Sequence, residues 1–248
     1  MSDVLAFVFV FSIIITSVGI VSAFGFRALQ DIQGDEQANN AVRGMESLGH
    51  NLGNVQRGHA PGRTGELKLS NGKIYVRENS EISVTVDCGG GAPPPGCDST
   101  FDFDMGTLYY DMESRDTNVT YENGAVFRED RGGSPLVVDG PRFICGDDYA
   151  VVSVVTLVSD AGAPGGGGTV QVIGREQETK LHFANDSVDT VRITVQDSRF
   201  DEGWVDYFQS DDNEWTVSST SPPIATCDVG SDGKVFVRRT IIDIDFIT

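Results

Sequence analysis

The sequence has few of the side chains that usually carry catalysis. It contains only 3 histidines among 248 residues. It also lacks the H-E-x-x-H, G-x-S-x-G, P-loop and G-x-G-x-x-G motifs of zinc proteases, serine hydrolases, NTPases and dinucleotide-binding enzymes. His50 and His59 lie on or just after a predicted stalk, and His182 stands alone in an alternating segment where an outward-facing side chain is expected. We therefore predict that the chain is not an enzyme and needs no cofactor.

Positive charge is also scarce. The chain has 18 basic side chains, only four of them lysine, against 37 acidic ones, and the residues after position 60 hold 32 acids and 15 bases. Such a surface repels nucleic acid and anionic lipid headgroups, because phosphate binding needs clustered Lys and Arg. Dense Asp is typical of proteins that stay hydrated at high salt, where screening over roughly 3 Å at 1 M reduces self-repulsion. Nucleic acid is therefore not expected as a partner.

The acidic residues do not form a recognisable metal loop. Asp102, Asp104 and Glu113 occupy positions 1, 3 and 12 of an EF-hand, but Thr107 stands where that loop requires glycine. Other oxygen-ligand clusters are conceivable at 211–213 and at Asp228 with Asp232. Solvated surface acids explain all of these segments more simply, so we predict no metal site.

The chain has only four cysteines, and all of them follow the predicted stalk. Cys88 and Cys97 bracket a Gly/Pro-rich loop that folds back easily, which leaves Cys145 to pair with Cys227. The spacing is not that of a zinc or redox motif, so structural disulfides and an oxidising exterior are expected. Two N-glycosylation sequons, at Asn118 and Asn185, are compatible with the same location.

Charge is absent from residues Val4 to Phe26. A helix of this length spans roughly 34 Å, enough to cross a bilayer. The segment lacks the basic start of a secretory signal. Two interpretations remain open: the chain begins at or near a processed N-terminus, with Met1 an artefact of numbering, or it is a membrane anchor inserted without a leader. The nearest positive charge, Arg27, lies on the head side of the apolar segment. By the positive-inside rule this argues mildly against export of the head, and removal of a leader would resolve the conflict.

The apolar segment does not give way to a flexible linker. Apolar residues recur at helical spacing from Ala38 to Val55, which predicts that the helix continues in amphipathic form until Gly58 and Pro61. Within its first part, small side chains follow one another at steps of 4, 3 and 4: Ser12, Thr16, Gly19 and Ala23. Such stripes let helices approach closely, although a lipid-facing helix with incidental small residues is the alternative.

Several segments resemble the haloarchaeal type IV pilin-like proteins. The resemblance rests on residues 2–11, 19–21, 35–41, 56–58 and 60–61, and continues with 121–128 and 204–208. It implies secretion and membership of a filament. It also implies three kinds of partner: a prepilin peptidase that removes a short leader, a pilus assembly machinery, and copies of the chain itself.

The resemblance places assembly on the N-terminal helix. Bacterial pilins carry a glutamate near its start, where this chain has Leu5, and archaeal relatives commonly lack that glutamate. Asp3 can replace it, or can simply cap the helix. The residues expected to contribute to assembly are Asp3, Leu5, Phe7, Phe9, Phe11, Ser12, Thr16, Gly19 and Ala23.

After Pro61 the apolar periodicity changes to two, typical of strands. A hairpin is predicted from 66–69 and 73–76 around Asn71-Gly72, with a mobile glycine-rich loop at 161–168 and a short helix over 201–209. The remaining strands are expected at 81–87, 100–110, 117–121, 124–128, 135–144, 149–158, 169–174, 179–184, 188–196, 214–218 and 234–247.

The predicted fold is therefore α+β. A long N-terminal helix, apolar and then amphipathic, occupies residues 1–58 and precedes an acidic, sandwich-like all-β head at 59–248. The function expected is that of a pilin in an extracellular filament used for adhesion or surface attachment, held in the membrane before assembly. The alternative is a single-pass membrane protein whose β-domain binds a ligand or partner without polymerising.

Overall fold

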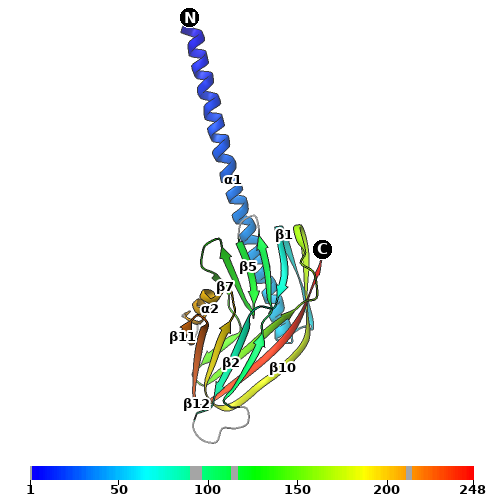
Figure 1. The fold of residues 1–248 in the computed structure, drawn as a ribbon. Helices are drawn as coiled ribbons and strands as arrows, with labels where there is room; N and C mark the ends of the chain where they lie inside the picture. The colour runs from blue at the N-terminus through cyan, green and yellow to red at the C-terminus, as the bar shows by residue number, and fades with distance from the viewer. Residues whose placement is uncertain (1, 90–96, 113–116, 211–213) are drawn as a thin grey trace. The chain divides into compact units, whose positions relative to one another are not determined.

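The computed structural model describes residues 2–89, 97–112, 117–210 and 214–248 (Figure 1). The side chains of residues 2, 3, 27, 28, 30 and 31 are outside this description. The chain divides into two compact units, Met1–Asn40 and Ala41–Thr248, and helix α1 (Ser2–Gln56) contributes to both. The predicted fold class is confirmed: an apolar N-terminal helix precedes a mostly β head.

Helix α1 ends where the sequence predicts. Gly58 has a φ of 73°, a left-handed conformation that favours glycine. The Gly58 amide donates to the carbonyl of Val55 at 2.9 Å, and the His59 amide donates to Asn54 at 3.0 Å. This pair of bonds is a Schellman motif, which satisfies carbonyls that the helix end would otherwise leave without partners.

The last four turns of α1 are part of the head's core. Met45, Leu48, Leu52 and Val55 are buried, as their helical spacing predicts. They pack in one cluster with side chains of the sheet, among them Val172. Burial of large apolar side chains stabilises a fold by about 1.5–3 kcal/mol each, which offsets the low helix propensity of the glycines in this half.

The head contains a short helix and twelve strands within the described residues. Their bounds are β1 Gly62–Arg77, β2 Glu81–Asp87, β3 Ser99–Asp104, β4 Thr107–Met112, β5 Thr117–Glu122, β6 Ala125–Asp130, β7 Leu136–Asp139, β8 Phe143–Gly146, β9 Tyr149–Val158, β10 Gly165–Gln196, α2 Asp201–Phe208, β11 Thr216–Thr220 and β12 Pro223–Ile247.

The strands form one hydrogen-bonded sheet with the order β7-β6-β5-β4-β1-β10-β12-β9-β8, and β2, β3 and β11 attach beside this path. All described pairs are antiparallel except β9 with β12, which run parallel. The C-terminal strand β12 lies between β10 and β9, so the end of the chain is held inside the sheet.

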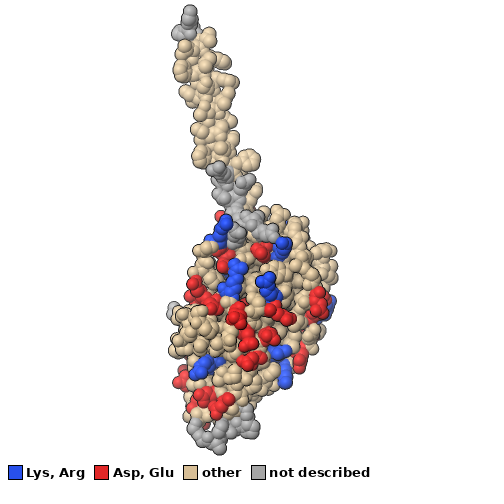
Figure 2. All heavy atoms as spheres, in the orientation of Figure 1, with Lys and Arg blue, Asp and Glu red and all other residues tan. Residues whose placement is uncertain are grey.

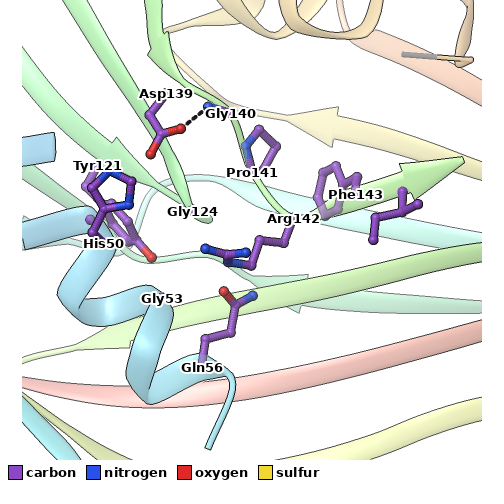
Figure 3. A pocket seen from close by; sticks show the side chains of 12 residues that line it. His50, Gly53, Gln56, Tyr121, Gly124, Asp139, Gly140, Pro141, Arg142 and Phe143 are labelled. Atoms are coloured by element: carbon purple, nitrogen blue, oxygen red, sulfur yellow. Dashed lines mark hydrogen bonds between the residues drawn. The ribbon is translucent and has the colours of Figure 1, made fainter. Parts of the chain in front are cut away.

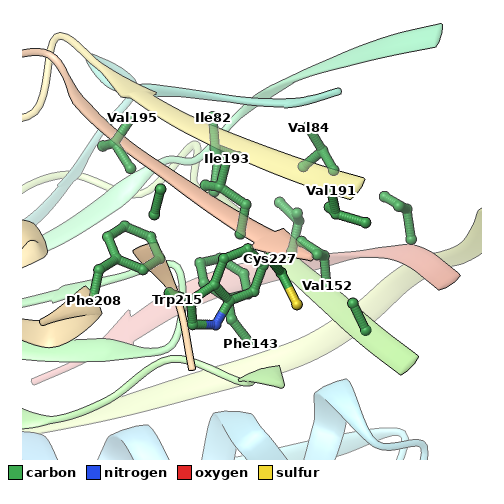
Figure 4. Close-up of a cluster of buried hydrophobic side chains, with 14 of the residues drawn as sticks. Ile82, Val84, Phe143, Val152, Val191, Ile193, Val195, Phe208, Trp215 and Cys227 are labelled. Atoms are coloured by element: carbon green, nitrogen blue, oxygen red, sulfur yellow. The ribbon is translucent and has the colours of Figure 1, made fainter. Parts of the chain in front are cut away.

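Two cores lie on opposite faces of β9. Val152 and Val154 belong to the core shown in Figure 4, which includes side chains of β2, β10 and α2. Val155 and Leu157 belong to the core that contains α1. This part of β9 is therefore buried on both faces, which fits its mostly apolar, β-branched sequence.

The hairpin predicted for residues 66–76 is wrong. Gly62–Arg77 is a single strand, which pairs first with β10 and then with β4. At Asn71 the backbone has a φ of 56°, and the register shifts beside Gly72. A Cβ on Gly72 would lie 2.4 Å from the backbone oxygen of Asp111, so glycine is required. The turn signal therefore marks a β-bulge, which bends one strand from one neighbour to the next.

The second half of the predicted glycine loop is also a strand. Gly165–Gly168 begin β10 and pair with β1, because the partner strand supplies hydrogen bonds to the glycine backbone. The three strands predicted between 169 and 196 are one strand of 32 residues, interrupted by register shifts. Conversely, the strand predicted at 100–110 is two strands, since Gly106 turns the chain with a φ of 58°.

Helix α2 confirms the predicted short helix, and its Trp204 contacts a buried acid, Glu122. Trp204, Tyr207 and Phe208 are buried in the core. The indole of Trp204 donates to Oε1 of Glu122 at 2.8 Å, and the Ser198 hydroxyl donates to the same oxygen at 2.7 Å. Glu122 is fully buried, and this burial raises the pKa of its carboxyl although hydrogen bonds oppose the shift.

Candidate functional site

The apolar part of α1 is exposed to its surroundings in the part of the chain that the structure describes. Every side chain from Val4 to Phe26 is exposed, and the segment is long and apolar enough to cross a membrane. Figure 2 shows no charged side chain along it, whereas acidic and basic groups are interspersed on the visible face of the head. An exposed apolar surface of this extent marks a contact with lipid or with another protein.

Two of the four hydroxyl side chains of this segment are bonded to their own helix. The Thr16 hydroxyl donates to the carbonyl of Ser12 at 2.7 Å, and the Ser17 hydroxyl donates to Ile14 at 2.9 Å. Transfer of such hydroxyls into an apolar environment costs little free energy, because each is already hydrogen-bonded to a carbonyl of its own helix. The segment is therefore suited to a bilayer and to a packed bundle of helices alike.

The predicted stripe of small residues lies along one side of the helix. With 100° between successive residues, Ser12, Thr16, Gly19 and Ala23 fall within an arc of about 60°. A Cβ on Gly19 or on Gly25 would meet nothing within 4 Å. Neither glycine is thus needed for packing within the chain, but only Gly19 lies on the stripe, since Gly25 is turned well away from it.

A shallow groove runs along one edge of this stripe. It has a volume of 320 Å³ and includes Ser12 and Thr16. It also includes Phe9, which the sequence placed on the assembly helix, and three residues that the sequence reasoning missed: Ile13, Ser17 and Ile20. The signal was available, because these residues lie three or four positions apart on the helix.

The other residues expected on the assembly helix are also on its surface. Leu5, Phe7, Phe9 and Phe11 are all exposed, and the rings of Phe7 and Phe11 stack with centroids 6.1 Å apart. The side chain of Asp3 is outside the described residues. With 100° between successive residues, Phe9 borders the stripe, whereas Phe7 lies on the face away from it, so the helix has an uneven apolar surface that neighbouring helices can fill.

The two expected disulfides are present. Cys88 bonds to Cys97, and Cys145 on β8 bonds to Cys227 on β12. The second bond joins residues 82 apart in sequence and is packed in the core. Both bonds are compatible with an extracellular location.

The two sequons differ in their surroundings. Asn118 lies in β5 between β4 and β6. With its amide in the orientation that satisfies both ends, Nδ2 donates to Asp111 at 3.2 Å and the amide oxygen accepts from Arg199 at 3.1 Å. Thr120 of the same sequon is fully buried. Asn185 lies at an irregular position of β10, where its oxygen accepts the amide of the exposed Ser187 at 3.0 Å. Only the second site offers an accessible sequon.

The acids and histidines that the sequence singled out in the head can be placed only where the structure describes them. Within the described ranges, no three His, Cys, Asp or Glu side chains are placed to hold a metal ion. Asp102 accepts a hydrogen bond from Ser83 at 2.7 Å on the strand β3, while Glu113 and residues 211–213 are outside the described residues. His182 packs edge-on against Phe103, and burial lowers the pKa of its imidazole.

The comparisons with known proteins give a family but no activity. No curated protein matches the chain, and no solved structure matches it. One family model matches residues 1–245, and thus covers the apolar helix and the head together. The chain therefore belongs to DUF7289, a family of unknown function.

Proposed function

We propose that this chain is the structural subunit of an extracellular, type IV pilus-like filament. The observation that carries the proposal is the apolar half of α1: 23 residues without charge, exposed along their whole length. Helices of this kind are stable only in lipid or among other helices. The resemblance of the sequence to haloarchaeal type IV pilin-like proteins supports the second environment as the final one.

The small-residue stripe favours polymerisation over simple anchoring. Gly19 disfavours a helix by about 1 kcal/mol relative to alanine, and a Cβ there would meet nothing within 4 Å among the described residues. Close approach of a neighbouring helix would require its lack of a side chain. The membrane holds the subunit first, and a prepilin peptidase removes its leader. Because lipid is as apolar as a helix bundle, moving the helix into the filament gains no hydrophobic free energy, so a powered assembly machinery completes the pathway.

The alternative function is a membrane-anchored β-domain that binds a ligand or partner as a single copy. The length and composition of Val4–Phe26 support this alternative as much as they support a filament, because a segment this long and apolar also suffices for a single membrane span. In either role the head is extracellular, and the role is structural or binding rather than catalytic.

Electron microscopy of sheared surface material separates the two functions. A pilin is expected in long filaments that an antibody against the head decorates, and mass spectrometry of the filament subunit is expected to show a processed N-terminus. A strain that lacks the gene is the control. If the chain stays in the membrane fraction as single copies at native salinity, the filament proposal is wrong and the anchored β-domain is favoured.

Glycosylation is expected at Asn185 and not at Asn118. A glycan on Asn118 would be attached to Nδ2, the atom that donates to Asp111 on the paired strand β4. Asn185 is partly exposed and has no such role. Glycopeptide mass spectrometry of the protein from its native cells measures the occupancy of both sites. Asn185→Gln should remove the modification, while Asn118→Gln should leave it unchanged.

A further inference from the structure

A cavity of 260 Å³ lies within the head, where the last turns of α1 meet the β5–β6 turn and the β7–β8 connection (Figure 3). It is separate from the apolar surface that carries the proposed function. Its lining residues come from three segments: Gly49, His50, Gly53 and Gln56; Tyr121 and Gly124; and residues 139–144.

Two glycines on α1 keep this cavity open. Gly49 and Gly53 are four residues apart and therefore share one helix face. A Cβ on Gly53 would lie 3.2 Å from Nη2 of Arg142, and a Cβ on Gly49 would lie 3.3 Å from Val126. Both additions would be tighter than ordinary contacts, so larger residues would crowd the Arg142 guanidinium and the wall beside it.

The cavity contains hydrogen-bond donors that have no partner. Arg142 is partly buried, and among the residues that the structure describes its guanidinium forms no ion pair and no hydrogen bond. The Tyr121 hydroxyl is buried without a hydrogen-bond partner. In Figure 3 this hydroxyl points toward the Arg142 guanidinium. Burial raises the pKa of Tyr121, so its hydroxyl remains a donor.

The local charge is unusual for this chain. Arg57 is close enough to help lower the pKa of Arg142, after the larger effect of burial. Arg57 donates to the Asn54 side chain at 2.6 Å and also has no carboxylate partner among the described residues. Asp139 is the acid at the rim, and one of its oxygens accepts the Gly140 amide at 3.0 Å. The lining holds one cation, Arg142, and one acid, Asp139, and the neighbouring Arg57 adds positive charge beside it within a chain of net charge −19.

We propose that this cavity binds a small oxyanion, a carboxylate or a phosphate, between the Arg142 guanidinium and the Tyr121 hydroxyl. A guanidinium presents a planar fork of donors that matches both groups, and a charge-assisted bond is stronger where water is partly excluded. The volume suits a ligand of a few heavy atoms and is below that of pockets for larger molecules, roughly 300–1,000 Å³. The ligand is therefore a small ion or metabolite.

The test is equilibrium dialysis of the full-length chain in detergent micelles with radiolabelled inorganic phosphate, at constant ionic strength in chloride. Saturable binding of one phosphate per chain is expected, and acetate should displace it competitively. Arg142→Gln should weaken binding about tenfold or more, since it removes a charge-assisted bond. Tyr121→Phe should weaken it less. Arg63→Gln changes the net charge equally at an exposed site and should leave binding unchanged.

Intrinsic tryptophan fluorescence confirms that each variant is folded before its binding is compared. Absence of saturable binding by the folded wild-type chain would overturn the proposal. Equal losses in Arg142→Gln and Arg63→Gln would also overturn it, because they would show general attraction by surface charge. The result does not depend on whether the chain forms filaments, since binding is measured on single copies in micelles.

Discussion

Replacing Gly19 with leucine is expected to abolish filament assembly while the head stays folded. The leucine side chain meets no atom of its own chain near the Cβ position. It also favours the helix relative to glycine, by up to about 1 kcal/mol. In a filament, however, it would separate helices that approach along the small-residue stripe. Electron microscopy counts filaments, and tryptophan fluorescence follows the head through Trp204 and Trp215, both buried in its core.

Gly25→Leu is the matched control for this prediction. Gly25 is in the same helix, is equally open, and lies away from the stripe. Its replacement makes the same change in size and apolar surface, so filaments should persist. Normal filaments from Gly19→Leu would show that the stripe is no interface. Loss of filaments in both variants would instead indicate that glycine acts through the flexibility of the helix.

The elements of this fold could be predicted better than their connections. Helical spacing identified α1 to its last turn, because burial and a glycine stop both leave a local signal. Strand β9 was likewise evident from its apolar sequence. The Asn71-Gly72 pair, however, signals a turn and a bulge equally well. Which of the two forms depends on whether β4 and β10 lie beside it, and no local pattern contains that information.

The candidate site was predictable only on the helix. Regular geometry converts sequence spacing into a surface there, so the stripe from Ser12 to Ala23 could be drawn before the structure was known. The Arg142 cavity joins the end of α1 to two segments about 70 to 90 positions further along the chain, and its residues have no motif. The role of Glu122 was hidden for a different reason. With 37 acids in the chain, only burial distinguishes this one.

Replacing Glu122 with alanine is expected to destabilise the head by about 3–5 kcal/mol, because buried donors that lose their acceptor each cost about 1–3 kcal/mol. The Trp204 indole has no alternative acceptor in the hydrogen bonds of this cluster, whereas the hydroxyls of Ser80 and Thr107, 3.1 Å apart, can bond to each other. Chemical denaturation of the full chain in micelles, followed by tryptophan fluorescence, measures the loss. Glu66→Ala, at an exposed position, should change stability by less than about 0.5 kcal/mol.

Glu122→Gln tests the charge of this acid separately from its bonds. Burial raises the pKa of Glu122 above its ordinary value of 4.5, so in the folded state the carboxyl holds its proton to higher pH than in the unfolded state. The acid therefore contributes most to stability at low pH, and its contribution falls as the pH rises from about 4.5 through the folded-state pKa. The stability of wild type relative to Glu122→Gln should decrease across that window and then level off. A difference that increases with pH would mean that the four surrounding donors stabilise the ionised carboxylate more than burial penalises it.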